Sequence, residues 1–262
     1  MKDFFINGIG EVPGLFSWSH LIYTGLSLVL IFVLVFFTRK QSNEKIIKYM
    51  KIISIAVLAL EVLKIVWNLT LRTPETKSDP AVNDYVPLYF CSFFIYVSLI
   101  VGFVKNKESY IHKFSVLFLF YGGMSGGLAF VLLPTTTLNI FPLLQVLSIH
   151  SLIYHVLMVT CAIWSLRFFK PTFKDFKLYA IGVLIIEVVV LIINLIFKTN
   201  FMLLNKPFEI APLEWIYENV PFIFPVLMAV GQMLVTYFAA FGISLVMNKF
   251  NLLNLQIQEE SK

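Results

Sequence analysis

The chain has 262 residues, of which 59% are hydrophobic and 13% are charged, and its mean hydropathy is +0.85. Soluble domains carry about 25% charged residues, so this composition excludes an ordinary soluble domain and indicates a protein embedded in a lipid bilayer. The net charge of +5 does not indicate a nucleic-acid partner, because the basic residues lie in short links between apolar segments. We therefore expect membrane lipids as partners, no nucleic acid and no cofactor, and the sequence leaves the oligomeric state open.

Apolar segments of about twenty residues, long enough to cross a hydrocarbon core of ~30 Å, recur along the whole chain. The first is too long for the apolar core of a signal peptide, so we count it as a transmembrane span. The pattern predicts an all-α polytopic membrane protein, a bundle of seven transmembrane helices in which residues 1–262 form a single transmembrane domain. The expected spans lie near 16–38, 47–71, 86–104, 112–133, 143–167, 177–198 and 219–247.

Lysine and arginine residues are distributed unevenly between the two sides of this predicted bundle. The links 39–51, 105–113 and 167–177, together with the C-terminal residues, carry 14 of them, whereas the other side carries five. Basic residues near span ends favour the cytoplasmic side. The sequence therefore predicts an external N-terminus and a cytoplasmic C-terminus in a multi-pass protein of the cell membrane.

The first two spans contain polar residues at positions where lipid-facing helices are apolar. His20 lies at the outer end of the first span, either as a hydrated interfacial residue or as part of a site. Glu61, Lys64 and Asn68 are three and four residues apart on one face of the second span. Ionisable groups at this depth normally face a bundle interior. They form either a structural ion pair or the lining of a site, or both.

The third span is expected to begin with Pro87 in its first helical turn, where its missing N–H has no partner to lose. This start places Cys91 roughly 6 Å below the outer end of the span at 1.5 Å per residue. His150 lies roughly 10 Å below the outer end of the fifth span, so contact between the two side chains is allowed. Cys161 lies about 16 Å deeper than His150, so a disulfide with Cys91 is not expected.

The remaining spans add small residues and further polar groups. Four glycines of the fourth span favour close packing of another helix over a phosphate-binding loop, and the short link that follows makes spans four and five antiparallel neighbours. On span five, His150, Tyr154 and Cys161 share a helical stripe, whereas His155 points elsewhere. Most polar groups of the bundle therefore lie in its outer half. The polar candidates on spans five and six, and in the link after span six, also include Gln145, Glu187, Asn194 and Asn200.

Several short motifs resemble the YwaF family of bacterial integral membrane proteins. The motifs follow one another along nearly the whole chain: Phe16-Ser17 before His20, the helix from Glu61 to Asn68, Pro87-Leu88-Tyr89-Phe90-Cys91, Leu133-Pro134-Thr135, Ser148-Ile149-His150, and Asn194 with Thr199-Asn200-Phe201 and Lys206-Pro207. This family is more distantly similar to transmembrane protein 164, an acyltransferase proposed to remodel ether phospholipids through a membrane cysteine and a histidine. The androgen-induced family of lipid hydrolases, with threonine in place of cysteine, is a further resemblance.

The resemblance implies a lipid acyltransferase or lipid-ester hydrolase in a bacterial plasma membrane. It implies Cys91 as the nucleophile and His150 as its base, and Ser92 stands where bacterial members often carry an acidic residue. A histidine that removes the thiol proton leaves a nucleophilic thiolate, which would form an acyl-cysteine with a lipid ester. Asn68, Asn194 or Gln145 is expected to donate to the oxyanion, and Lys64 to meet a phosphate. His20, Glu61, His155 and Asn200 complete the expected supporting residues.

Two other functions are compatible with the same residues. A small-solute or ion transporter would use Glu61, Lys64 and Glu187 as its polar path, although the cytoplasmic halves of the spans are nearly all apolar. A metal site could draw on His20, Cys91, His150 and His155, but no pair of them has a tight ligand spacing. We therefore expect no metal.

Overall fold

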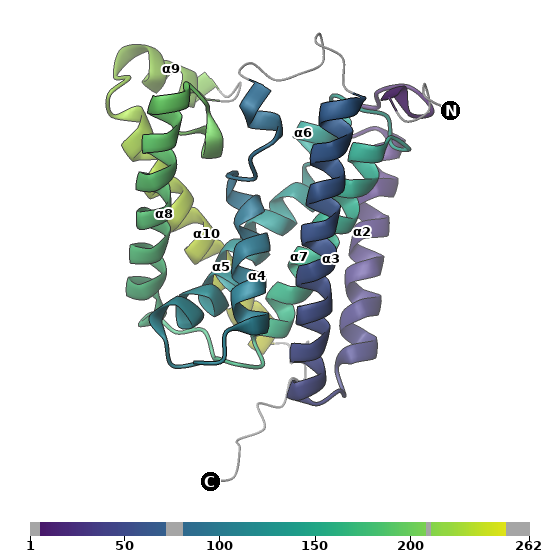
Figure 1. The fold of residues 1–262 in the computed structure, drawn as a ribbon, viewed down its shortest axis with the longest axis vertical. Helices are drawn as coiled ribbons and strands as arrows, with labels where there is room; N and C mark the ends of the chain where they lie inside the picture. Colours follow the sequence, from purple (N-terminus) through teal and green to yellow (C-terminus); the bar gives the residue numbers. More distant parts are fainter. Residues whose placement is uncertain (1–5, 72–80, 208–210, 250–262) are drawn as a thin grey trace.

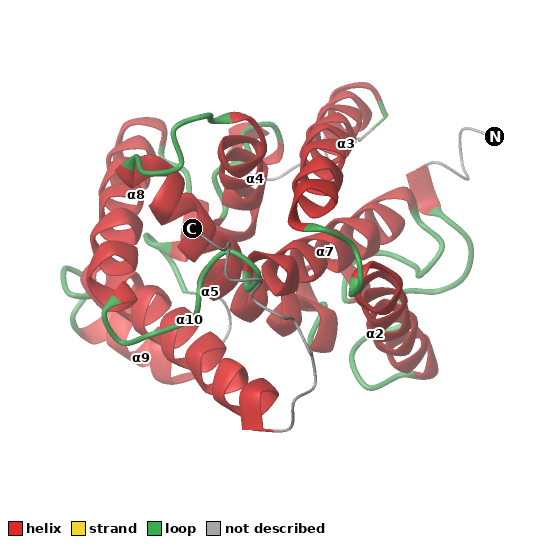
Figure 2. Cartoon of the chain, turned by 90° about the horizontal axis from the view of Figure 1, so that it is seen from below, coloured by secondary structure: helices red, strands yellow, loops and turns green. Residues whose placement is uncertain are grey.

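The computed structural model describes residues 6–71, 81–207 and 211–249. In these residues the secondary structure is entirely helical (Figure 2). Six helices are long and apolar enough to cross a membrane: α2 (Trp18–Thr38), α3 (Asn43–Thr70), α5 (Tyr110–Leu132), α7 (Val146–Ser165), α8 (Asp175–Phe197) and α10 (Phe224–Lys249). Shorter helices lie between them: η2 (Ala81–Asp84), η3 (Phe90–Ser92), α4 (Phe93–Phe103), α6 (Thr135–Leu138), η4 (Phe201–Leu203) and α9 (Ala211–Asn219).

Serine residues mark the starts of three of the long helices. The Oγ atoms of Ser17, Ser42 and Ser109 accept hydrogen bonds from the backbone N–H three residues later, at the beginnings of α2, α3 and α5. Such caps satisfy N–H groups that have no partner inside the helix. The predicted spans one, two, four, five and six agree with these helices to within a few residues.

The prediction for the third span is wrong in its first four residues. Only Phe90–Phe103 is helical there, and Pro87 precedes the helix instead of standing in its first turn. These 14 residues reach about 21 Å at 1.5 Å per residue, which is less than the ~30 Å of a hydrocarbon core. The described part of the chain therefore has six helices of spanning length and a shorter one, and the seven-helix count is not confirmed.

Two links are more structured than the sequence indicates. The link that follows α8 contains η4 and the amphipathic helix α9, where the sequence predicts only a loop. Residues 72–80, in the link between the second and third predicted spans, lie outside the described residues, and η2 forms the end of that link. Helices α6 and α9 lie at one end of the molecule, here called the α9 end. The turns joining α2 to α3, α4 to α5 and α7 to α8 lie at the other (Figure 1).

Helices α5 and α7 form the centre of the bundle, packed against each other and surrounded by the remaining helices (Figure 2). In their most apolar stretches 67% and 56% of the residues are buried within the protein, compared with 17–28% in the other four spanning helices. The outer helices expose leucine, isoleucine, valine and phenylalanine side chains. This arrangement is expected of a bundle whose solvent is lipid.

The glycines of α5 allow the close approach of α7, as the sequence predicts. A Cβ atom on Gly123 would lie 3.4 Å from the Cβ of Ala162, and one on Gly127 would lie 2.6 Å from the Cγ2 of Val159. The antiparallel neighbours predicted from the short link are thus confirmed, with a small-residue contact between them.

Replacement of Gly127 tests this contact. We expect Gly127→Ala to lower the free energy of unfolding by about 1–3 kcal/mol, because the added methyl group overlaps Val159 and the two helices must move apart. Gly25→Ala on α2 is the matched control, since no atom lies within 4 Å of its added methyl group. Thermal unfolding in detergent measures both. An equal effect of the two substitutions would contradict close packing at Gly127.

Candidate functional site

The candidate nucleophile Cys91 lies in η3, between the non-helical residues 86–89 and helix α4. Its side chain is half-buried and its thiol is free. A Cβ atom on Gly126 of α5 would lie 3.5 Å from the Cys91 sulfur and 3.7 Å from the terminal methyl of Met158 on α7. The sulfur therefore lies beside the α5–α7 contact, where glycine leaves the room for it.

Tyr154 of α7 connects this cysteine to the candidate base. Its hydroxyl donates a 3.0 Å hydrogen bond to the backbone carbonyl of Cys91. Its ring lies against the ring of His150, one turn earlier in α7, with centroids 5.8 Å apart and planes inclined by 25°. The sequence places Tyr154 on the stripe of His150, but no sequence signal indicates its bond to Cys91.

His150 faces the ion pair of α3. Its Nε2 atom lies 3.9 Å from the Oε2 of Glu61, and the Nζ of Lys64 lies 2.5 Å from the Oε1 of the same carboxylate. The first distance is too long for a hydrogen bond, and the Nε2 atom of His150 has no hydrogen-bond partner among the described residues. The Glu61 side chain is 4% exposed and that of Lys64 is 25% exposed. Lys64 and Glu61 are therefore partners, as the sequence allows, and they adjoin His150.

His155 lies on a different face of α7, as the stripe predicts. Its Nδ1 atom is 2.8 Å from the carbonyl of Ser151, and its ring stacks on Phe130 with centroids 3.7 Å apart. Since a carbonyl can only accept, Nδ1 carries the proton. The Nε2 atom is buried and has no hydrogen-bond partner among the described residues.

Three of the remaining candidates hold the ends of helices or loops. His20 joins α2 to α5, because its Nδ1 accepts from the N–H of Phe16 at 2.8 Å and its Nε2 lies 2.9 Å from the carbonyl of Leu132. Gln145 caps α7 by accepting from the N–H of Leu147. Asn200 binds the backbone of Asn205 and Lys206.

Asn194, an expected oxyanion donor, is also committed to the fold. Its Nδ2 donates to the carbonyl of Phe201 at 2.9 Å, and its Oδ1 accepts from the N–H of Phe201 and the hydroxyl of Thr199. Asn68 is buried on α3, seven residues beyond Glu61. Of the predicted site residues, the structure thus brings Glu61, Lys64 and His150 together and connects them to Cys91 through Tyr154.

Glu187, the acidic residue predicted near the middle of the sixth span, lies on the buried stripe of α8 and is 2% exposed. Neither of its carboxylate oxygens has a hydrogen-bond partner among the described residues. No group of three or more histidine, cysteine or acidic side chains suited to a metal ion occurs in the described ranges 6–71, 81–207 and 211–249.

A sequence model of the TMEM164 family matches residues 15–239, a range that contains every one of these side chains. The chain belongs to the TMEM164 family. The match confirms the predicted resemblance to transmembrane protein 164, whereas the assignment to the bacterial YwaF family stays a prediction. Membership of the TMEM164 family is compatible with a membrane acyltransferase-like role. No curated protein and no solved structure matches the chain significantly.

The pairing of Glu61 with Lys64 can be tested by stability. We expect Glu61→Gln to destabilise the protein by about 3–5 kcal/mol, because it leaves the Lys64 charge without a partner within the membrane. The double variant Glu61→Leu with Lys64→Met removes both charges and should destabilise it less. Thermal unfolding in detergent and the amount of protein in the membrane fraction measure the difference. Equal stability of the two variants would show that the groups are not partners.

Proposed function

We propose that this TMEM164-family protein is a membrane-embedded lipid acyltransferase or lipid-ester hydrolase, with Cys91 as nucleophile and His150 as general base. The observation that carries the proposal is the position of Tyr154, whose hydroxyl binds the Cys91 main chain while its ring contacts His150. The family match and the multi-pass helical fold support a substrate drawn from the surrounding lipid.

The reaction follows from the chemistry of these two side chains. His150 takes the proton of the Cys91 thiol, and the thiolate attacks the carbonyl carbon of a lipid ester. A carbon–sulfur bond forms, the carbon–oxygen bond to the leaving alcohol breaks, and His150 returns its proton to that alcohol. In the second step His150 takes a proton from an acceptor alcohol or from water, whose oxygen attacks the thioester, and the released thiolate regains the proton.

The ion pair next to His150 supplies two further roles. Glu61 lies close enough to the imidazole to stabilise the protonated form that His150 takes on within each step. Lys64 is partly exposed while Glu61 is buried, so the ammonium group is the member of the pair that can meet a lipid phosphate. Asn194 and Gln145 bind the backbone of the fold, so we no longer propose these two side chains as donors to the oxyanion.

Transport of a small solute or ion is the second candidate. The burial of Glu187, with no hydrogen-bond partner in the described part of the chain, favours it. Such carboxylates are typical of proton paths through membranes. The path, however, would have to include the Glu61–Lys64 pair of α3, while the stripe of Glu187 belongs to α8, which packs against α10 and α5. Cys91→Ala separates the two candidates, because it abolishes acyl transfer and leaves transport intact.

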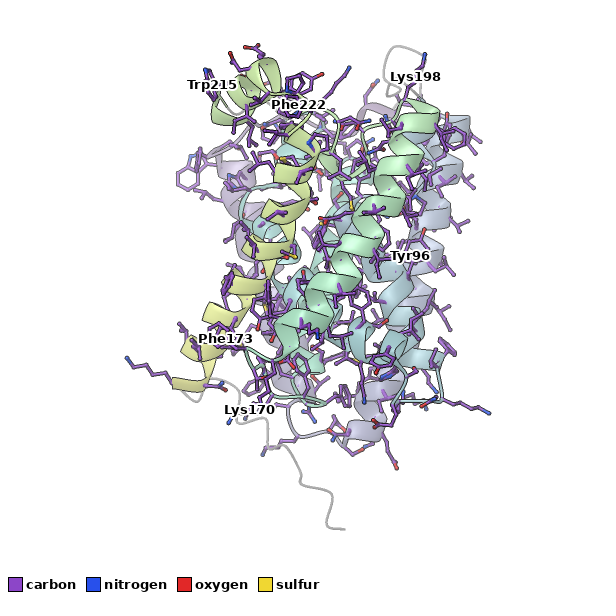
Figure 3. All side chains as sticks on the ribbon, turned by 90° about the vertical axis from the view of Figure 1, so that its left-hand side faces the viewer. Tyr96, Lys170, Phe173, Lys198, Trp215 and Phe222 are labelled. Atoms are coloured by element: carbon purple, nitrogen blue, oxygen red, sulfur yellow. The ribbon has the colours of Figure 1, made fainter. Side chains whose placement is uncertain are left out.

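The orientation of the bundle is part of the same proposal. Lysine and arginine residues of the described chain gather at the end opposite α9, where the turns hold Arg39, Lys40, Lys105, Lys107 and Arg167. Lys170 lies at that end as well, whereas Lys198, Trp215 and Phe222 lie at the α9 end (Figure 3). The positive-inside rule then places the N-terminus and the α9 end outside. The bacterial plasma membrane stays a prediction.

Reporter fusions test this orientation. We expect a reporter inserted in the link 39–51 to be cytoplasmic and one inserted in the link 72–84 to be external, because the first link carries five basic residues. Paired fusions active only on one side of the membrane make the measurement. An external link 39–51 would reverse the proposed orientation and place the Cys91 site in the inner leaflet.

An acyl group on Cys91 is the decisive expectation of the proposal. Intact-mass spectrometry of protein purified with lipids should show a fatty-acyl adduct that neutral hydroxylamine removes, since this reagent cleaves thioesters. Cys91→Ala should abolish the adduct. Cys161→Ala is the matched control and should retain it, because Cys161 is fully buried in α7. His150→Ala should slow the formation of the adduct about 10²–10⁴-fold, the contribution of a general base.

The same variants define what would overturn the proposal. Turnover of lipid esters by Cys91→Ala at the wild-type rate would exclude a covalent cysteine intermediate. Comparison of membrane lipids with and without the protein then identifies the acyl donor and distinguishes transfer from hydrolysis.

A further inference from the structure

Tyr154 contacts both residues of the candidate pair, Cys91 and His150. It is 4% exposed, and its hydroxyl donates to the carbonyl of Cys91. Its ring also meets Phe94 of α4 edge-on at 5.6 Å and His155 at 5.3 Å, in addition to His150. Because these neighbours enclose the ring, it is held in one orientation, and its hydroxyl is directed at the Cys91 carbonyl.

The main chain of Cys91 depends on this hydroxyl because its own helix holds it weakly. Cys91 belongs to the three-residue helix η3, and α4 begins only at Phe93. The non-helical residues 86–89 precede it, so it lacks a preceding helical turn of the kind that fixes a residue inside a long helix. The Cys91 carbonyl accepts from the N–H of Phe93 at the end of η3 and from Tyr154 of a neighbouring helix.

We propose that Tyr154 is a positioning residue. It holds Cys91 and His150 in the relative position that proton transfer between them requires. The hydroxyl fixes the backbone of the nucleophile, and the ring supports the imidazole of the base one turn away on the same helix. This inference rests on the proposed function, since it assigns Tyr154 a task between the two reacting side chains. Tyr154 itself touches neither the sulfur nor the substrate in this role.

Tyr154→Phe tests the inference because it keeps the ring and removes only the hydrogen bond. The readout is the rate of alkylation of Cys91 by iodoacetamide across a range of pH, in a Cys161→Ala background that leaves one thiol. We expect the rate to fall about fivefold, the effect of one neutral hydrogen bond. The pH profile should also change from the wild-type form to that of His150→Ala, because the base no longer meets the thiol.

Two further variants make the result specific. Tyr23→Phe is the matched control, since the Tyr23 side chain is buried and its hydroxyl has no hydrogen-bond partner among the described residues. It should leave the rate and the profile unchanged. Tyr154→4-aminophenylalanine retains a ring donor for the carbonyl and should restore both.

A purely structural role gives a different outcome. In that case Tyr154→Phe lowers the melting temperature and leaves the pH profile of alkylation at its wild-type form, which would overturn the inference. Alkylation needs no lipid substrate, so it separates this inference from the function proposed above. A Cys91 that never carries an acyl group but shows the expected alkylation profiles would refute the acyl-transfer proposal and leave the positioning by Tyr154 in place.

Discussion

Backbone N–H and C=O groups within a bilayer cannot form hydrogen bonds with water. A chain that leaves the helical conformation there must therefore be covered by protein that binds these groups. Residues 86–89 pose this problem at the point where the third apolar segment is not helical. The side chains of Val86 and Leu88 pack with Phe201, Met202 and Val190 in a separate apolar cluster, and the ring of Tyr89 meets Phe201 edge-on at 5.5 Å. The carbonyl of Pro87 accepts from the hydroxyl of Tyr96.

The requirement for cover explains the polar residues of α8 and α10 that bind the link after α8. Asn194 binds Phe201 through both its amide nitrogen and its amide oxygen, and Gln232 of α10 donates to the carbonyl of Met202 at 2.7 Å. These bonds hold η4 in a conformation that includes positive φ angles at Met202 and Leu203, which side-chain-bearing residues rarely adopt. The asparagine therefore supports the site through the loop that covers it.

The sequence predicts the helices and the level of the polar groups well, because both depend on local pattern and on distance along a helix axis. Spacing alone placed Glu61 and Lys64 on one face, and they form an ion pair. The broken third helix was not predictable in the same way, since a proline is equally suited to a first helical turn and to an extended segment before it. What decides between them is the tertiary contact with η4 and Tyr154, which lie far away in sequence.

The same limit applies to the amide and imidazole side chains. A polar residue in an apolar span signals that it needs a partner, but the spacing does not say whether that partner is a substrate or the backbone. His20 and Asn194 found backbone partners at helix ends, where unpaired groups of the main chain are concentrated. Glu61, Lys64 and His150 lie more than one turn inside their helices, where the main chain has no such groups to offer.

The difference between the two cysteines follows from the same physical principle. Cys161 lies inside α7 and is fully buried, so its backbone is held by a regular helix and its sulfur fills space in the core. Cys91 lies in the first turn of the Phe90–Phe103 helix, next to the non-helical residues 86–89, half-buried, with its carbonyl bound by a residue of another helix. A non-helical segment at membrane depth costs stability unless neighbouring elements bind its polar groups. Here η4 packs against this segment, and the hydroxyls of Tyr96 and Tyr154 donate to the carbonyls of Pro87 and Cys91. Tyr154 does so from the helix that also carries His150.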